Sequence, residues 1–237
     1  MKLKLTQLFI TTLIAFPFCA DAAVILVTTR ASQNANDLID WGTLGSPLTD
    51  IPNPFGVFSS GGLPFIVSLP SGGPFTRRDE NPAGGGLGGW SGNFAPGDHL
   101  IDHLGTDGPL TLTLMPPNGV IRGAGVQIEA NQPGNFTATI IAFDVNGNSL
   151  GSFNVNGTSA FTADNSAIYI GVLSDTANIH AISFDTNTSS FGGDFAINRV
   201  SITVPEPSFS LLLLSGVPLL LRRRMLRTHD RNVWYQL

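Results

Sequence analysis

The chain has 237 residues, only 12% of them charged, and a formal net charge of −5 at pH 7. Lysine occurs only at Lys2 and Lys4, and acidic side chains outnumber arginines between Ala23 and Val204. A lysine-free acidic body lacks the basic surface that nucleic acid or anionic lipid would require, which argues against both partners. The single cysteine, Cys19, lies in the N-terminal apolar run, so the rest of the chain has no disulfide, thiolate metal site or cysteine nucleophile.

The N-terminus predicts a secretory signal peptide over residues 1–22. Two lysines precede an apolar run from Leu8 to Phe18, and Ala20-Asp21-Ala22 then supplies a small-x-small cleavage pattern. We expect cleavage after Ala22. The alternative is a lipoprotein signal acylated at Cys19, but the residue before such a cysteine is small, and here it is phenylalanine.

Residues 23–203 predict one all-β domain, a jelly-roll-like β-sandwich. Thr, Ser, Asn, Val, Ile and Phe are plentiful, and long polar helix formers are scarce. Asn146-Gly147 between strand formers at 136–143 and 149–155 is the clearest hairpin signal, because both turn residues accept positive φ. Several short strands separated by turns are typical of a sandwich, and the further strands expected are 111–114, 124–129, 167–173, 179–184 and 195–203.

The segment 48–97 is rich in glycine and proline, so we expect long loops there, with two strands near Phe55–Phe58 and Phe65–Leu69. Trp41 precedes this segment and is expected to pack in the core. Trp90 lies within it, so we expect an exposed ring that contacts a glycan by stacking on a sugar.

The cluster Asp98-His99-Leu100-Ile101-Asp102-His103 has the i, i+4 spacing of metal ligands on a helical face. Pro96-Gly97 before it and Gly105 after it leave room only for a very short helix. We therefore expect a solvated loop or a strand edge, and we predict no metal site. A calcium loop starting at Asp144 would need glycine at its sixth position, where the chain has Ser149.

Catalytic motifs are not evident. A glycosidase needs two carboxylates on either side of a sugar, and no pair is indicated by the positions of Glu80, Glu129 and the scattered aspartates. The chain has no Gly-x-Ser-x-Gly elbow and no phosphate-binding glycine loop. We predict that the protein is not an enzyme and needs no cofactor.

Residues 204–237 predict a sorting tail. Val204-Pro205-Glu206-Pro207-Ser208 precedes an apolar run from Phe209 to Leu221, and Arg222, Arg223 and Arg224 follow. At about 1.5 Å per residue the run spans roughly 20 Å, less than the roughly 30 Å hydrocarbon core of a bilayer. The arginines would hold its end on the cytoplasmic side while it pauses there during export. The alternative is a soluble core helix, but that would carry a polar stripe.

In this order the three parts resemble the PEP-CTERM sorting signal, and the resemblance is confined to the tail. It implies that Pro205, Glu206 and Pro207 are the recognition motif, that the apolar run is the transmembrane part, and that the arginines stop transfer. It also implies two partners, the secretion translocon and an exosortase-type membrane enzyme. One departure is that such tails end soon after the arginines, whereas this chain continues to Leu237.

The body has a looser resemblance. Asp40-Trp41-Gly42 near its start, Gly147 in the hairpin and Asp194-Phe195-Ala196-Ile197 near its end form a pattern similar to envelope jelly-roll domains that precede PEP-CTERM tails. This resemblance implies a sandwich with carbohydrate affinity but no specific ligand.

The sequence thus predicts an exported protein that passes transiently through the inner membrane and reaches the cell surface or extracellular matrix. The leading hypothesis gives the sandwich a structural or adhesive role. The alternative is a carbohydrate-binding module that acts on exopolysaccharide, and a secreted hydrolase is the third hypothesis. Fold alone does not choose among them.

Overall fold

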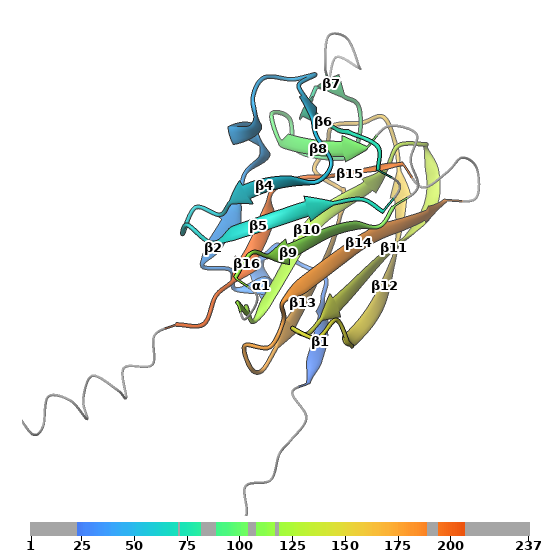
Figure 1. Cartoon of the computed structure of the whole chain (residues 1–237). Helices are drawn as coiled ribbons and strands as arrows, with labels where there is room; N and C mark the ends of the chain where they lie inside the picture. Colours follow the sequence, from blue (N-terminus) through green and yellow to red (C-terminus); the bar gives the residue numbers. More distant parts are fainter. Residues whose placement is uncertain are drawn as a thin grey trace, which may run out of the picture.

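The computed structural model describes residues 23–70, 72–81, 89–103, 108–116, 119–188 and 194–206. These residues form two β-sheets packed face to face (Figure 1), which confirms the all-β sandwich expected from the sequence. The expected signal peptide and the tail from Pro207 onward lie outside the described residues. In the described part of the chain, no helix is long and apolar enough to cross a membrane.

One sheet has ten strands. Its main path runs in the order β1 (Val24–Val27), β13 (Ile168–Ser174), β10 (Gly123–Ala130), β15 (Phe195–Ile197), β8 (His99–His103), β6 (Phe75–Glu80) and β3 (Asp50–Ile51). β16 (Val200–Thr203) pairs with both β10 and β2 (Asp37–Ile39), and β7 (Gly89–Trp90) pairs with β6. The single strand expected at 195–203 is therefore two strands, both of which pair with β10.

The other sheet has six strands. They lie in the order β12 (Ser149–Ser159), β11 (Gly134–Phe143), β14 (Ala181–Thr188), β9 (Leu110–Leu114), β5 (Pro64–Ser68) and β4 (Phe55–Phe58). All of their pairings are antiparallel. Two short helices complete the described chain, α1 (Arg30–Gln33) and the 3-10 helix η1 (Trp41–Leu44).

A single apolar core fills the space between the sheets. On β11, Phe136 and Ile140 point inward and are buried, while Thr137 points outward, as the two-residue period of a strand requires. Trp41 is fully buried, and its indole Nε1 donates to the carbonyl oxygen of Asn198 at 2.9 Å. This confirms the expectation that Trp41 is a core residue.

The expected hairpin joins β11 to β12. Asp144 at the start of the turn accepts hydrogen bonds from the backbone N–H groups of Asn146 and Asn148, each at 2.8 Å. Gly147 has φ of 80°, a backbone conformation that favours glycine. The hydrogen bonds of the turn account for the Asp144 carboxylate in the way the sequence predicted.

The expectation of loops between residues 48 and 97 is partly wrong. β4 and β5 form near the two predicted positions, but β3, β6 and β7 also arise in this segment. β6 was missed because Arg77, Arg78 and Asp79 give it the composition of a solvated loop. Their charges are paired within the fold: Arg77 with Asp79, and Arg78 with the buried Asp102 of β8 at 3.2 Å.

Two glutamates are buried beneath the segment 90–94. The N–H of Gly92 donates to Glu80 Oε1 at 3.2 Å, and the N–H of Asn93 donates to Glu129 Oε2 at 2.6 Å. Burial raises the pKa of Glu80 to about 8, although the Gly92 hydrogen bond opposes the shift, and burial also raises the pKa of Glu129. The folded protein therefore holds Glu80 mainly as the neutral acid at pH 7.

Replacing Gly147 with alanine is expected to destabilise the hairpin by about 1–2 kcal/mol, because an L-residue in the left-handed region clashes with its own backbone. The measurement is the midpoint of urea-induced unfolding. Gly56→Ala is the matched control, since Gly56 lies in β4 without a positive φ and the nearest atom to an added Cβ would be 3.9 Å away. Equal midpoints for the two variants would contradict the prediction.

The stability of the protein is expected to fall as pH rises from about 5 to 8. Because the folded state raises the pKa of Glu80 from 4.5 to about 8, folding takes up a proton across this interval, and that stabilisation is lost as pH passes the folded pKa. Glu80→Gln mimics the neutral acid and should flatten the decline, measured as urea midpoints at pH 5, 6.5 and 8. Glu206→Gln changes an exposed residue and should keep the wild-type dependence of the urea midpoint on pH. If the midpoint of Glu80→Gln fell with pH as steeply as that of the wild type, Glu80 would not be the group responsible.

Candidate functional site

Charge is divided unequally between the two sheets. The six strands of the smaller sheet contain one charged residue, Asp185 on β14. The ten-stranded sheet contains the ion pairs of β6 and β8 and the two buried glutamates. Asp185 lies opposite the outward-pointing Thr139, so the outward side chains of the smaller sheet are uncharged apart from this one carboxylate.

The outer face of the ten-stranded sheet is covered on part of its area by α1. Gln33 of α1 is fully buried and donates to the carbonyl oxygen of Val172 at 3.0 Å. Side chains at Gly123 or Gly171 would collide with Gln33, so glycine at these positions lets the helix lie directly on the strands.

The segment after β7 covers another part of the same face. Glu129 points outward from β10 and accepts hydrogen bonds from the Asn93 N–H, from Ser159 Oγ at 2.8 Å and from Trp90 Nε1 at 3.4 Å. Trp90 and Phe94 pack with Leu100 in a second, smaller apolar cluster. These contacts leave the outer face of the six-stranded sheet as the more open of the two.

Trp90 is therefore not the exposed platform expected from the sequence. Its side chain is buried, with 6% exposed, and its indole points to a carboxylate inside the fold. The expectation failed because the glycine-rich segment folds back over β10, a long-range contact that local composition does not reveal. A buried indole face is not available to stack on a sugar ring.

We define the outer face of the six-stranded sheet as the side chains that point away from the core. On β11 and β12 these are mainly threonine and asparagine, bonded across the strands. Thr137 Oγ1 donates to Asn156 Oδ1 at 3.0 Å, and Thr139 Oγ1 donates to Asn154 Oδ1 at 2.9 Å. Because each asparagine accepts through Oδ1, its Nδ2 group is left to donate to another molecule.

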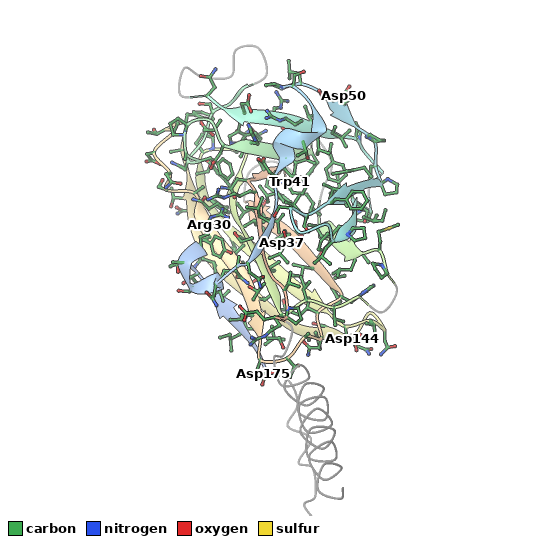
Figure 2. The ribbon with its side chains drawn as sticks, turned by 90° about the vertical axis from the view of Figure 1, so that its left-hand side faces the viewer. Arg30, Asp37, Trp41, Asp50, Asp144 and Asp175 are labelled. Carbon is green, nitrogen blue, oxygen red and sulfur yellow. The ribbon has the colours of Figure 1, made fainter. Side chains whose placement is uncertain are left out.

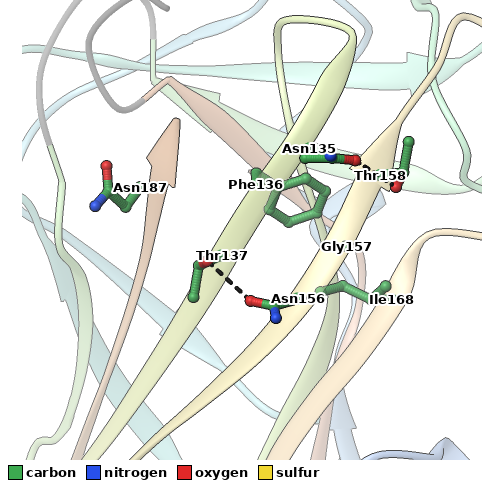
Figure 3. A pocket seen from close by; sticks show the side chains of 8 residues that line it. All are labelled: Asn135, Phe136, Thr137, Asn156, Gly157, Thr158, Ile168 and Asn187. Carbon is green, nitrogen blue, oxygen red and sulfur yellow. Dashed lines mark hydrogen bonds between the residues drawn. The ribbon is translucent and has the colours of Figure 1, made fainter. Parts of the chain in front are cut away.

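A hollow of about 770 Å³ opens where β11 begins and where β12 and β14 end (Figure 3). It is lined by Asn135, Phe136, Thr137, Asn156, Gly157, Thr158, Ile168 and Asn187. In Figure 3, Thr158 and Asn135 are joined by a hydrogen bond of 3.1 Å, and Asn187 lies on the opposite side of Thr137 from Asn156. We call this the amide hollow, since three asparagines line it.

A second hollow of about 710 Å³ lies at the other end of the same face, beside the turn of the hairpin. Phe143 and His180 line it together with hydroxyl groups such as Thr111. Hydrogen bonds from Asn148 hold the pKa of Asp144, at its rim, below the ordinary value for aspartate, so this carboxylate is ionised near neutral pH. The rim of this hollow is more acidic than the amide hollow.

The histidine cluster does not form a solvated loop, which corrects the expectation for residues 98–103. It forms β8, a strand between β15 and β6, and Asp102 and His103 are buried. His99 Nδ1 lies 2.8 Å from Asp40 Oδ1. Among the residues that the structure describes, no three His, Cys, Asp or Glu side chains come together in a way that could hold a metal ion.

Glu80 and Glu129, which the sequence did not pair, are brought together against Gly92. Their side chains are 3% and 1% exposed. A glycosidase pair flanks a cleft that admits the sugar and a water molecule. Among the described residues the two carboxyl groups are buried, and their hydrogen bonds hold the covering segment in place.

The sorting motif begins at the boundary of the fold. Pro205 and Glu206 come after β16 and the single residue Val204, and both are exposed. Pro207, Arg222, Arg223 and Arg224 lie outside the described residues, as does the expected helix from Phe209 to Leu221.

The outer face of the six-stranded sheet is a candidate binding surface that sequence reasoning missed. A signal for it was present, since Thr137 and Thr139 alternate with apolar residues before Asn146-Gly147, and Asn154 and Asn156 do so after it. If the two strands were known to turn the same face to solvent, these four residues could have been placed opposite one another across the strands.

No protein-family model and no curated protein matches the chain. Among solved structures, a DUF4465 family protein from Bacteroides caccae ATCC 43185 is similar with a TM-score of 0.39 and 16% identity, over 78% of this chain and 99% of that one. The enzymatically active domain of bacteriophage CBA120 tailspike protein 4 is similar with a TM-score of 0.32 and 17% identity, over 60% of this chain and 19% of that one. CsCBM6-3 from Clostridium stercorarium, solved with cellobiose, is similar with a TM-score of 0.22 and 12% identity, over 76% of this chain and 94% of that one. At these TM-scores the similarities assign no function to the chain.

Proposed function

We propose that the protein is an exported cell-envelope or extracellular-matrix protein, sorted and processed at its Pro205-Glu206-Pro207 motif, with a structural or adhesive β-sandwich. The observation that carries the sorting proposal is the exposure of Pro205 and Glu206, which begin one residue beyond the last strand. An exosortase-type membrane enzyme would reach a motif in this position without unfolding the sandwich. The proposal includes export through the secretion translocon and gives the body no catalytic role.

The ends of the sandwich support a tethered arrangement. Val24 pairs with Ser174, and Gly123 pairs with both Leu173 and Thr203, so the chain enters and leaves the sandwich at one end. Figure 2 shows Asp144 and Asp175 at this end and Asp50 at the opposite one. A protein held by its tail would present the far end, with the amide hollow, away from the membrane.

The proposal includes a jelly-roll-like topology for the sandwich. Within each sheet, several neighbouring strands are not consecutive in the chain: β14 lies between β11 and β9, and β10 lies between β13 and β15. The chain therefore crosses repeatedly from one sheet to the other, as it does in jelly rolls.

The sorting proposal is tested by the mass of the mature protein isolated from its native envelope. The wild-type chain is expected to end near the motif, whereas a variant with Pro205, Glu206 and Pro207 replaced by alanine should run on to Leu237. Val204→Ala, which leaves the motif intact beside it, should be processed like wild type. A wild-type mass that extends to Leu237 would rule out processing at this motif.

A second candidate function is binding of neutral polysaccharide at the amide hollow. The supporting observation is its chemistry: amides and hydroxyls, which both donate and accept, line an open surface on a sheet that has no lysine or arginine. Sugar hydroxyls are recognised by such groups, whereas an acidic polysaccharide would need basic side chains.

The combined substitution Thr137→Ala and Asn187→Ala is expected to weaken binding to a neutral polysaccharide by roughly tenfold, since each lost hydrogen bond costs about 0.5–1.5 kcal/mol. The measurement is titration calorimetry with a panel of neutral and uronate-containing polysaccharides. Asp175→Ala, on the loop after β13, is the control and should bind like wild type. A preference for the uronate-containing members, or no binding at all, would eliminate this candidate.

A further inference from the structure

β12 is a long edge strand without charge or proline, and its one irregularity in the pairing with β11 is a bulge at Leu150, beside the hairpin. It pairs with β11 on one side and lies at the end of the six-stranded sheet on the other. An edge strand presents a row of unpaired N–H and C=O groups, and natural proteins usually shield it with charge, proline or shortness. β12 has eleven residues, Ser149–Ser159, without a charged residue or a proline.

The other strands at the ends of the described sheets are short. β4 and β1 have four residues each, β2 has three, and β3 and β7 have two. β12 therefore offers more continuous backbone to an incoming strand than any of these does.

An apolar seam runs along the same side of the sandwich. β1 of the larger sheet lies beside β12 (Figure 1), and a Cβ added at Gly151 would lie 3.7 Å from the Cβ of Val24. Phe153 and Val155 of β12 pack against the core but are only half-buried, as is Leu26 of β1. A strand that docked on β12 would bury more of these side chains, which favours association.

We propose that β12 is a self-association edge through which two copies of this chain pair antiparallel about a two-fold axis. The two six-stranded sheets would then form one continuous sheet. A two-fold axis sets the strand against itself, so a charged residue near the axis would face its own copy, and β12 has none.

The outward side chains of β12 are also complementary to themselves. In a register centred on Asn154, Ser152 of one copy would face Asn156 of the other. Asparagine and serine both donate and accept, and Asn154 and Asn156 already pair with threonines of β11 in this manner. This self-complementarity favours a second copy over an unrelated strand as the occupant.

The direction of β12 determines how the two copies lie. The strand starts at the hairpin, near the end where the chain enters and leaves the sandwich, and runs toward the far end. Antiparallel pairing therefore places the two tail ends at opposite ends of the dimer. Under the proposed function, such a dimer would join copies held on two surfaces that face each other, or copies that have been released from the membrane. The pairing itself does not depend on sorting.

Single-cysteine cross-linking in the native envelope tests the proposal. Ser152→Cys, Asn154→Cys and Asn156→Cys are made one at a time in a Cys19→Ser background, so that the introduced thiol is alone. Residues opposite each other across an antiparallel pair have Cβ atoms about 4.5–5.5 Å apart, near enough for a disulfide after small shifts. At least one of the three should give a disulfide-linked dimer on a non-reducing gel.

Asn187→Cys is the matched control, because it lies on the same face but on β14, two strands from the edge, and should stay monomeric. A charge pair provides the second measurement. Asn154→Lys should raise the dimer dissociation constant by roughly tenfold in sedimentation velocity, since it sets like charges opposite each other, whereas Asn187→Lys should not.

The proposal is overturned if none of the three cysteines cross-links and the wild-type chain sediments as a monomer. It is also overturned if the β12 cysteines capture a different protein, since the occupant is then not a second copy. The mass measurement of the tail is independent of both outcomes, so failure of self-association and failure of sorting are distinguishable.

Discussion

The buried carboxylate of Glu129 connects three parts of the molecule that are distant in sequence. It points from the centre of the ten-stranded sheet toward the segment after β7 and accepts hydrogen bonds from Asn93, Trp90 and Ser159. A buried carboxyl group that lost these donors would be strongly destabilising, so the covering segment and the end of β12 are held in place together. Ser159 is the last residue of β12, and this contact fixes the far end of the edge strand to the opposite sheet.

The same constraint explains why the two outer faces differ. The ten-stranded sheet carries the charged and ion-paired residues, and α1 and the segment 90–94 cover parts of its outer face. Glycines on β10 and β13 permit the close approach of α1. With these coverings on one side, the amide and hydroxyl groups of the other sheet stay open to solvent.

The sequence was sufficient where structure is set by local patterns. The β11–β12 hairpin follows from Asn146-Gly147 and the alternation on both sides of it, and the burial of Trp41 agrees with a strand-rich core. β6 and Trp90 could not be predicted in this way. The charged side chains of β6 have partners that include Asp102 of β8. Trp90 is buried against Glu129 and Phe94. Asp102 and Glu129 are remote in sequence from the residues they contact, and local composition does not identify Phe94 as a partner of Trp90.

The distribution of charge also bears on how copies of this protein would meet. The whole chain has a net charge of −5, so two copies repel at long range, and this repulsion opposes indiscriminate aggregation. Repulsion falls off within about 8–10 Å at physiological ionic strength, so close contact is decided by the local surface. The six-stranded sheet carries only Asp185 as a charge, and β12 carries none. β1, β4 and β7 are also uncharged strands at the ends of the sheets, but they are short, so β12 is the longest uncharged edge among the described strands and the one best suited to close pairing.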